Sequence, residues 1–208
     1  MKRFLFLLTI IGVSLTACNK DSYNEIISEE SNNLDNDKIV LGPAIGSVIT
    51  KNGAKGVVFY SDDKVTKIVS VDEGSDLYWS RESVVTLADN RTNGVNNMVK
   101  IKNILYWNQG LYPAFIWCAE YGKDWYLPAL NELHEIHTQI EVVNAVLLAG
   151  NYTPIANDYD SIRYYWSSTE MDQKFAYYYS FIGNGRDYSG FKELKEDLCV
   201  RAIFAFNN

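Results

Sequence analysis

The segment Gly122–Leu133, with the sequence Gly-Lys-Asp-Trp-Tyr-Leu-Pro-Ala-Leu-Asn-Glu-Leu, constrains the fold more than any other part of this chain. Gly122 is suited to end one helix, and Pro128 is suited to open the next. Between them, Trp125 and Leu127 alternate along an extended piece and would point into a core. The segment therefore predicts two consecutive helices joined by a short buried strand.

The flanking residues agree with this prediction. Upstream, residues 113–121 form a short apolar helix that contains Cys118. Downstream, residues 129–140 repeat apolar side chains at helical spacing. This stripe consists of Leu130, Leu133, Ile136 and Ile140. A third short helix is expected over residues 141–149, ending at Gly150.

Strands are predicted on both sides of these helices. Turns at residues 52–53 and 62–64 divide residues 48–71 into three strands. Further strands are expected at 164–168, at 175–181 with rings at every second position, and at 199–206. The last is apolar on both faces apart from Arg201, as in a central strand. The class is α+β, with two main helices packed on short, mostly antiparallel sheets.

Residues 72–112 give weaker patterns. Residues 83–89 are expected to form a helical turn, and residues 91–97 a loop. Trp79, Tyr106 and Trp107 are expected to pack in or beside the core.

The N-terminus has the pattern of a secretory signal. Lys2 and Arg3 precede an apolar run that is too short to span a membrane, and Leu15-Thr-Ala-Cys18 follows. The motif Leu15-Thr-Ala-Cys18 resembles the lipobox of bacterial lipoproteins, which implies cleavage after residue 17 and lipidation of Cys18. The alternative is an ordinary signal peptide with a chance cysteine. Residues 18–38 are polar and acidic, as in a flexible tether, and the domain would comprise residues 39–208.

The formal net charge is −7. Like charges repel, so this balance argues against nucleic acid and anionic membrane surfaces as the main partner. The net charge says nothing about whether the chain binds neutral sugars.

The cysteine count fits an extracytoplasmic compartment. If Cys18 carries lipid, Cys118 and Cys199 remain. Outside the cytoplasm two such thiols more often pair than stay free, and the closed loop would stabilise the fold by about 4 kcal/mol. Two buried free thiols and a metal pair are the alternatives.

Four motifs in order resemble one known family. They are Asp124-Trp-Tyr-Leu-Pro-x-x-x-Glu-Leu133, Tyr165-Trp-Ser-Ser-Thr-Glu170, Ala176-Tyr with Phe181, and Cys199-Val-Arg201, preceded by Gly56-Val-Val-Phe-Tyr60 as an opening strand. Together they resemble the collagen-like-adhesin C-terminal domain family of bacterial extracytoplasmic proteins, also called the major paralogous domain, over roughly residues 45–206.

The resemblance implies a C-type-lectin-like fold, shared with formylglycine-generating enzymes. It also implies a disulfide between Cys118 and Cys199 and a location at the outer membrane or cell surface of a Gram-negative bacterium. The residues carried over as fold determinants are Trp125, Leu127, Pro128, Glu132, Leu133, Trp166, Ser167, Ser168 and Arg201. Where the family usually has Ser or Thr, this chain has Ala129, so only the Glu132 half of a capping box remains and the helix start should be weaker by about 1 kcal/mol.

No pattern for catalysis is evident. His134 and His137 have His-Glu-x-His spacing, which excludes the zinc-protease motif and favours the edge of an amphipathic helix over a metal site. The cysteines could form a catalytic thiol pair as in the formylglycine-generating relatives, yet no histidine pattern supports thiol activation. Nothing resembles a nucleophile elbow or a phosphate loop. We expect no enzymatic activity and no cofactor.

Two polar loops are candidates for ligand binding, residues 151–163 and 183–190. Tyr, Asn and Asp together suit a sugar, because a ring packs on the pyranose while polar groups bind hydroxyls. Asp158 and Asp160, with Asn157, could hold calcium, although the calcium-dependent sugar motifs of lectins are absent. The alternative is that both loops are solvated connections. The candidate residues are Asn157, Asp158, Tyr159, Asp160, Tyr164, Asn184, Arg186 and Asp187.

The sequence thus predicts a lipid-anchored, non-enzymatic extracytoplasmic domain for binding or adhesion. Its ligand would be a glycan or a surface protein, and nucleic acid is not expected as a partner. A structural or assembly subunit of a cell-surface complex or filament is the alternative. An enzyme related to sulfatase-modifying factors is the third possibility.

Overall fold

The computed structural model describes residues 42–160 and 162–208. The chain's contacts group Ile39–Asn208 into one unit. The predicted signal peptide, Cys18 and the tether lie outside the described residues. No helix in the described part is long and apolar enough to cross a bilayer.

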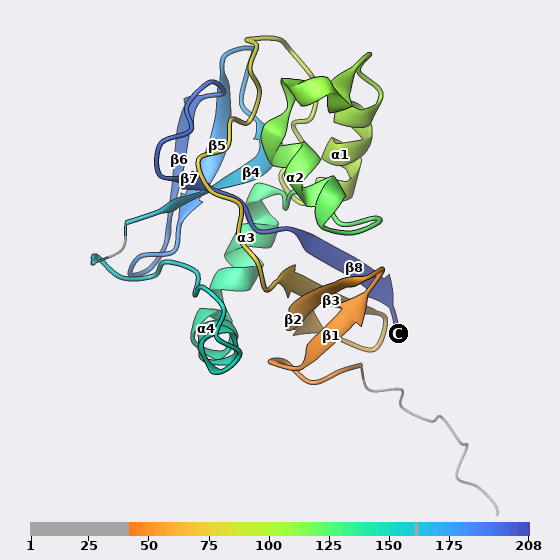
Figure 1. Ribbon diagram of the computed structural model, residues 1–208, viewed down its shortest axis with the longest axis vertical. Coiled ribbons are helices and arrows are strands. Elements are labelled where there is room, and N and C mark those ends of the chain that lie inside the picture. Colours follow the sequence, from red (N-terminus) through yellow and green to blue (C-terminus); the bar gives the residue numbers. More distant parts are fainter. Residues whose placement is uncertain (1–41, 161) are drawn as a thin grey trace, which may run out of the picture. The chain divides into compact units, whose positions relative to one another are not determined.

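Two four-stranded sheets form the strand-rich part of the fold (Figure 1). The strand order is β1-β2-β3-β8 in the first sheet and β6-β5-β4-β7 in the second. All pairs are antiparallel except β4 with β7. The first sheet contains β1 (Val48–Lys51), β2 (Ala54–Ser61), β3 (Val65–Ser70) and β8 (Ile203–Asn207). The second contains β4 (Tyr164–Glu170), β5 (Phe175–Ser180), β6 (Arg186–Phe191) and β7 (Leu198–Cys199).

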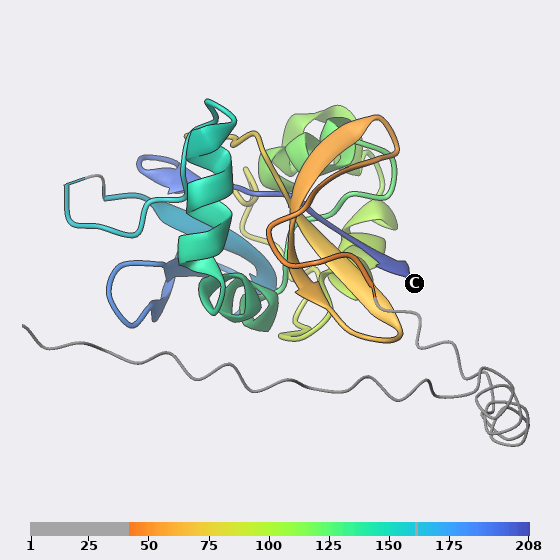
Figure 2. The same cartoon turned by 90° about the horizontal axis from the view of Figure 1, so that it is seen from below.

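Helices pack beside and between these sheets. α3 contacts β2 of the first sheet and both β4 and β5 of the second, so it lies between them (Figures 1 and 2). The α+β class is confirmed. The helical elements are α1 (Gly94–Lys102), η1 (Trp107–Leu111), α2 (Pro113–Tyr121), α3 (Leu130–His137) and α4 (Ile140–Ala149). α2 has the bounds predicted for the first helix, whereas Ile140 begins α4 instead of ending the second.

The segment between α2 and α3 enters the core as predicted. Trp125 and Leu127 are both fully buried. Tyr126 pairs with Ile203 through two backbone hydrogen bonds of 3.0 Å, which sets this segment beside β8. The indole of Trp125 donates to the Lys51 carbonyl at 3.1 Å. All of the predicted fold determinants are buried: Trp125, Leu127, Pro128, Glu132, Leu133, Trp166, Ser167, Ser168 and Arg201.

A buried carboxylate fixes the start of α3. Glu132, 3% exposed, accepts hydrogen bonds from the backbone of Ala129 (2.9 Å) and of Gly94 (3.0 Å) and from the Tyr126 hydroxyl (3.0 Å). The first is the expected half of a capping box. The second ties α3 to the start of α1. Burial raises the pKa of Glu132 above its ordinary value.

The missing half of the box is replaced by tertiary contacts. The backbone N–H of Leu130 donates to Thr169 Oγ1 at 3.1 Å, and that of Asn131 donates to the Arg91 carbonyl at 2.8 Å. These are the donors that a helix start leaves without partners inside the helix. The weakening expected from Ala129 is therefore offset by β4 and by the segment before α1.

Replacement of Thr169 with valine should expose the dependence of α3 on this contact. The change keeps the shape but leaves the buried Leu130 N–H without its partner and removes one of the two donors to the Asn90 carbonyl. We expect the free energy of unfolding to fall by about 1–3 kcal/mol in chemical denaturation. The exposed Thr92→Val is the matched control and should change it by less than about 0.5 kcal/mol. Equal effects of both changes would contradict the replacement cap.

Residues 72–112 differ from the sequence-based expectation. Residues 94–97, expected as loop, begin α1, because Asn93 caps it by accepting from the Asn96 backbone at 2.9 Å. Residues 83–89, expected as a helical turn, are irregular. Trp79 is fully buried as predicted, while Tyr106 is 60% exposed and lies outside the core.

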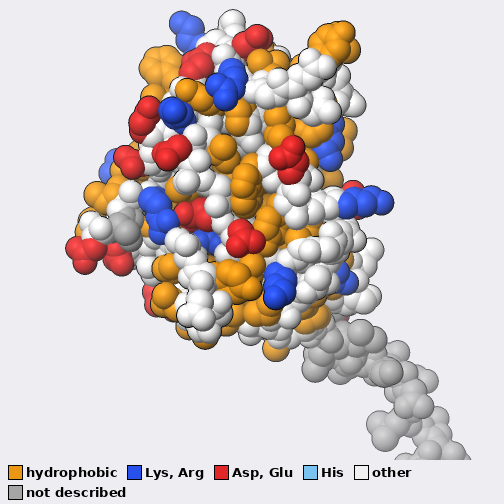
Figure 3. Space-filling view, viewed as in Figure 1, with side chains coloured by type: hydrophobic (Ala, Val, Ile, Leu, Met, Phe, Trp, Pro, Cys, Tyr) orange, Lys and Arg blue, Asp and Glu red, His pale blue; other side chains and the backbone are white. Residues whose placement is uncertain are grey.

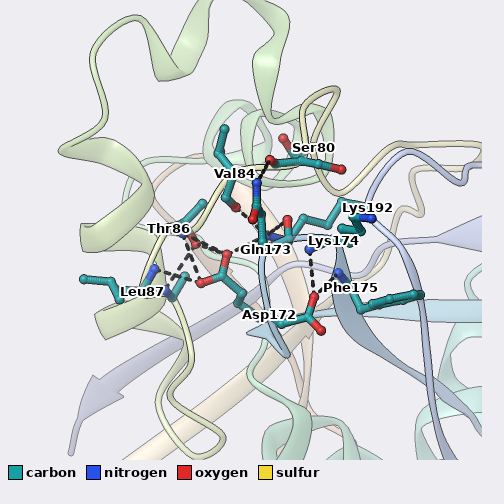
Figure 4. Close-up of polar contacts among 12 residues, drawn as sticks. Ser80, Val84, Thr86, Leu87, Asp172, Gln173, Lys174, Phe175 and Lys192 are labelled. Atoms are coloured by element: carbon teal, nitrogen blue, oxygen red, sulfur yellow. Dashed lines mark hydrogen bonds and ion pairs between the residues drawn. The ribbon is translucent and has the colours of Figure 1, made fainter.

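A buried ion pair holds this irregular segment against the second sheet (Figure 4). Lys192, fully buried, contacts Glu170 at 2.5 Å and donates to the Val84 carbonyl at 2.7 Å. Glu170 also accepts from the backbone of Thr86 and Leu87, each at 2.8 Å. Burial lowers the pKa of Lys192, while the adjacent carboxylate opposes this effect. These contacts with charged side chains hold the backbone of residues 84–87, which has no helical hydrogen bonds of its own.

The C-terminal strand prediction is wrong in its topology. Residues 199–206 do not form one central strand, because β7 ends at Cys199 in the second sheet and β8 begins at Ile203 at the edge of the first. Arg201 lies between them, 1% exposed. Its guanidinium pairs with Glu73 at 3.1 Å and donates to the carbonyls of Val71 (2.8 Å) and Thr153 (2.5 Å). The residue that interrupts the apolar pattern thus marks the change of sheet.

The predicted disulfide is also wrong: Cys118 and Cys199 are free, buried thiols. Their surroundings differ. Cys118 belongs to α2 and to the apolar core, and burial alone raises its pKa well above the usual value. Cys199 lies beside Glu73, and burial together with that carboxylate raises its pKa to about 12. Both thiols belong to the hydrophobic core, and only Cys199 also lies beside a buried carboxylate.

Candidate functional site

An open groove of about 740 Å³ lies between α3 and the β5–β6 hairpin. Aromatic, imidazole, amide and charged groups line it, and both walls contribute polar atoms. The lining residues are His134, His137, Thr138, Tyr179, Asn184, Gly185, Arg186 and Asp187.

The helical wall carries two histidines. His134 and His137 are three residues apart on α3, so they lie on one face of the helix. His134 Nε2 lies 2.6 Å from Asp187 Oδ1, while Arg91 approaches the other oxygen of that carboxylate at 3.3 Å. Asp187, on β6, is therefore held between an imidazole and a guanidinium, which links the hairpin to α3 and to the segment before α1.

Tyr179 forms the centre of the opposite wall. Its ring packs against both imidazoles, with centroid distances of 4.9 Å to His134 and 5.6 Å to His137. Its hydroxyl lies 2.5 Å from His137 Nδ1. Burial and the Asp187 charge raise the pKa of Tyr179 to about 12, so the phenol stays neutral. Burial lowers the pKa of His137, which favours its neutral form too.

Glycines let the hairpin turn close against this wall. Gly183 and Gly185 have φ values of +62° and +75°, which residues with a Cβ rarely adopt. A Cβ on Gly185 would overlap the Tyr179 hydroxyl and the His137 ring. The turn backbone therefore lies directly over the His137–Tyr179 pair and closes one end of the groove.

Three of the predicted ligand residues meet in this groove, Asn184, Arg186 and Asp187. The structure corrects their context, because residues 186–190 form β6 instead of a loop. Arg186 extends over the Tyr188 ring, 5.1 Å from its centroid, and so marks the rim. Tyr159 is 79% exposed, and its hydroxyl lies 3.9 Å from the position of a Cβ on Gly183, next to the turn.

The other predicted ligand residues do not join the groove. Asn157 donates to Glu141 at 3.1 Å, and Asp158 accepts from the Asp160 backbone at 3.1 Å. Tyr164 packs with Tyr178 and Tyr188 on the opposite face of the second sheet. Among the described residues, no group of three or more His, Cys, Asp or Glu side chains is placed to hold a metal ion. His134 and His137 bond to different partners and do not converge on one point.

Sequence reasoning missed Tyr179 and His137 as members of one site. The ring alternation along β5 and the three-residue spacing of the histidines were visible, yet the contact joins residues 42 positions apart. Arg91 was also missed; its guanidinium lies 4.6 Å from the Tyr177 centroid and reaches Asp187 from outside the groove.

The lowered pKa of His137 predicts a loss of stability in mild acid. Below about pH 6.5, the unfolded chain takes up a proton on this histidine before the folded chain does. The free energy of unfolding should therefore fall as the pH decreases from 7.5 to 5.5. In the His137→Gln variant it should fall less, because the group that takes up this proton is absent. Chemical denaturation of both proteins at the two pH values tests it. The same decrease in both would contradict a neutral, partly buried His137.

Comparison with known proteins places few constraints on the chain. No family model matches it, and no curated protein matches its sequence. Among solved structures, it is similar to a fimbrial protein from Bacteroides ovatus, with 19% identity and a TM-score of 0.45 over 68% of this chain and 36% of that chain. The chain thus spans about a third of that protein, and a likeness at this level supports no conclusion about fold or function. The resemblance to the collagen-like-adhesin C-terminal domain family stays a hypothesis.

Proposed function

We propose that this protein is a non-enzymatic, extracytoplasmic binding domain whose ligand is a glycan held in the groove between α3 and the β5–β6 hairpin. The observation that carries the proposal is the lining of the groove, where the exposed imidazole of His134 packs on the buried ring of Tyr179, with Asn184 and Asp187 at the same groove. The exposed imidazole of His134 would pack against the apolar face of a pyranose, while an amide and a carboxylate would bind its hydroxyls.

The shape of the site also suits a glycan. The groove is open to solvent, so it can accept part of a longer chain without enclosing it. Asp187 is positioned in advance by His134 and Arg91, which lowers the cost of ordering the site on binding. No calcium is needed for these contacts.

The state of the two thiols supports a role without catalysis. A thiol reacts as its thiolate, and the pKa values of Cys118 and Cys199 are raised by burial, the latter to about 12. Both therefore stay protonated near neutral pH. This speaks against the thiol chemistry of the formylglycine-generating relatives.

The N-terminal signal supports the remainder of the proposal: a lipid anchor on Cys18 and a place at the outer membrane or cell surface. The C-type-lectin-like architecture belongs to the same hypothesis. It is supported by β8, which brings the end of the domain back beside β3 near its start, and by the buried Trp-Tyr-Leu-Pro segment. Mass spectrometry of the mature protein tests the anchor, because an unmodified Cys18 would contradict it.

A glycan array of neutral and acidic oligosaccharides tests the binding function. We expect the full chain to bind at least one glycan, with and without calcium, and Asp187→Ala to lower that affinity by at least 10-fold, because a hydrogen bond to a charged group is worth about 1.5–3 kcal/mol. Asp160→Ala, in the loop that does not join the groove, is the control and should bind as the unmodified protein does. Absence of binding to every glycan, together with co-purification of a protein partner, would favour an assembly subunit instead.

A further inference from the structure

A second group of polar and aromatic side chains adjoins the groove on the β5–β6 hairpin. Strand alternation puts Tyr177 on the same face as Tyr179, about 7 Å farther from the turn. Ser189 lies opposite Tyr177 in the register of the two strands. The Arg91 guanidinium covers the Tyr177 ring at 4.6 Å, and the Arg91 carbonyl accepts from the Asn131 backbone at the start of α3. Arg91 therefore stands beside the groove, on the side away from the turn.

Asp187 connects this group to the groove. One oxygen of its carboxylate lies 2.6 Å from His134 Nε2, and the other accepts from Arg91 at 3.3 Å. His134 and Arg91 thus lie side by side along the hairpin, each against a tyrosine of β5. The turn blocks the other direction, because no space is left between Gly185 and the Tyr179 hydroxyl. A glycan chain that leaves the groove along the sheet must pass Arg91.

Arg91 has hydrogen-bonding capacity that the protein does not use. A guanidinium carries several N–H donors, and among the described residues Asp187 is the one partner that accepts from it. The Arg91 side chain is 44% exposed, so the remaining donors can reach a ligand. Tyr177 and Asp187 hold the guanidinium in place, which lowers the cost of ordering it on binding. Ser189, which is also exposed, adds a hydroxyl on the same face.

We infer that Arg91 binds the second unit of a neutral, linear oligosaccharide whose first unit lies in the groove; this inference rests on the proposed function. The first unit packs on the His134 imidazole. Hydroxyls of the second unit accept hydrogen bonds from Arg91, and a charged donor makes these bonds stronger than those of a neutral one. Asp187, between the two positions, contacts both residues and fixes their spacing.

The charges around Arg91 favour a neutral sugar over an acidic one. Asp187 already balances the Arg91 charge, and its carboxylate repels an acidic group placed next to it. The formal net charge of −7 acts in the same direction. Figure 3 shows acidic and basic side chains interspersed over one face of the domain, so no field of a single sign on that face selects a charged polymer.

Titration calorimetry of the full chain with cellobiose, mannobiose and chitobiose, each compared with its monosaccharide, tests the inference. At least one disaccharide should bind about 10-fold or more tightly than its monosaccharide, because the second unit gains hydrogen bonds to a charged group. In the Arg91→Lys variant that disaccharide should bind at most about 2-fold more tightly than the monosaccharide, since lysine keeps the charge beside Asp187 but loses the planar set of donors.

The ratio of the two affinities distinguishes a direct contact from an indirect effect. If Arg91 acted only by positioning Asp187, the variant would weaken both sugars equally and leave the ratio unchanged. Arg81→Lys is the matched control, because Arg81 also lies 4.6 Å from a tyrosine ring, that of Tyr78, but donates to the Gly110 carbonyl and does not line the groove. It should leave the ratio as it is in the unmodified chain.

An unchanged ratio in Arg91→Lys, or an equal change in Arg81→Lys, would overturn the inference. Equal affinities for monosaccharide and disaccharide in the unmodified chain would do the same, and so would tighter binding of a disaccharide that carries glucuronic acid. If none of these sugars binds, the inference is wrong, whereas binding of another glycan on the array would still support the proposed function.

Discussion

Replacement of Arg201 with methionine is expected to lower the free energy of unfolding by about 3–5 kcal/mol. Arg201 is 1% exposed, and it is the donor for the carbonyls of Ser70, Val71 and Thr153. Methionine fills much of the same volume but leaves these carbonyls unpaired and removes one cation from the buried Glu73. Because domains of this size are stable by about 5–15 kcal/mol, the loss should be visible as a large shift in urea denaturation.

Arg163→Met is the matched control for this prediction. Arg163 pairs with the same carboxylate at 2.6 Å, but its side chain is 26% exposed. We expect less than half of the loss seen at Arg201, because water can replace part of its interaction. A change within about 1 kcal/mol for Arg201→Met, or an equal loss for both variants, would contradict the view that Arg201 fixes the crossing between the sheets.

Gly185→Ala is expected to abolish glycan binding in the groove. The new Cβ would overlap the Tyr179 hydroxyl and the His137 ring, and the φ of +75° adds strain. Either the turn or Tyr179 must move, so the wall of the groove is displaced. Binding should fall below detection on an array that detects binding by the unmodified chain. The free energy of unfolding should fall by more than the cost of the positive φ alone.

Gly53→Ala separates these two causes. Gly53 has a comparable φ of +84°, but nothing lies within 4 Å of a Cβ placed there. It should lose about 1–2 kcal/mol through the left-handed conformation and bind the glycan unchanged. If Gly185→Ala retains affinity, or destabilises no more than Gly53→Ala does, the turn does not form the wall of a binding site.

Local signals explain the parts of the fold that the sequence predicted. Pro113 begins α2 because the first position of a helix needs no N–H, and Gly122 follows the last residue of this helix. Trp125 and Leu127 are buried because alternation in a short extended piece leaves one face for the core. The Asn52-Gly53 turn follows from residues that accept positive φ.

The parts that failed depend on partners far away in the sequence. β6 resembled a loop because it is polar and contains Gly190, yet Tyr188 stacks on Tyr178 of β5 and the backbone pairs along the whole strand. The split between β7 and β8 depends on Arg201 and Glu73, which are 128 positions apart. The cysteines illustrate the same limit, since composition favoured pairing while both thiols are free in the core.

The candidate site shows a similar division. Asn184, Arg186 and Asp187 were predicted because a polar turn between glycines is typical of a binding loop. The opposite wall could not be placed, since His134 and His137 reach the hairpin only after α3 packs on β5. Tyr159 approaches the turn at Gly183, whereas Asp158 and Asp160 do not line the groove.

Amide chemical shifts during titration with the monosaccharide that forms the first unit of the bound glycan would test the central claim most directly. The account predicts that the perturbed amides lie in residues 134–138 and 179–187, with none in residues 151–160 except next to Tyr159. Perturbations confined to the 151–160 loop, or to the opposite face around Tyr164 and Tyr178, would contradict the groove as the site.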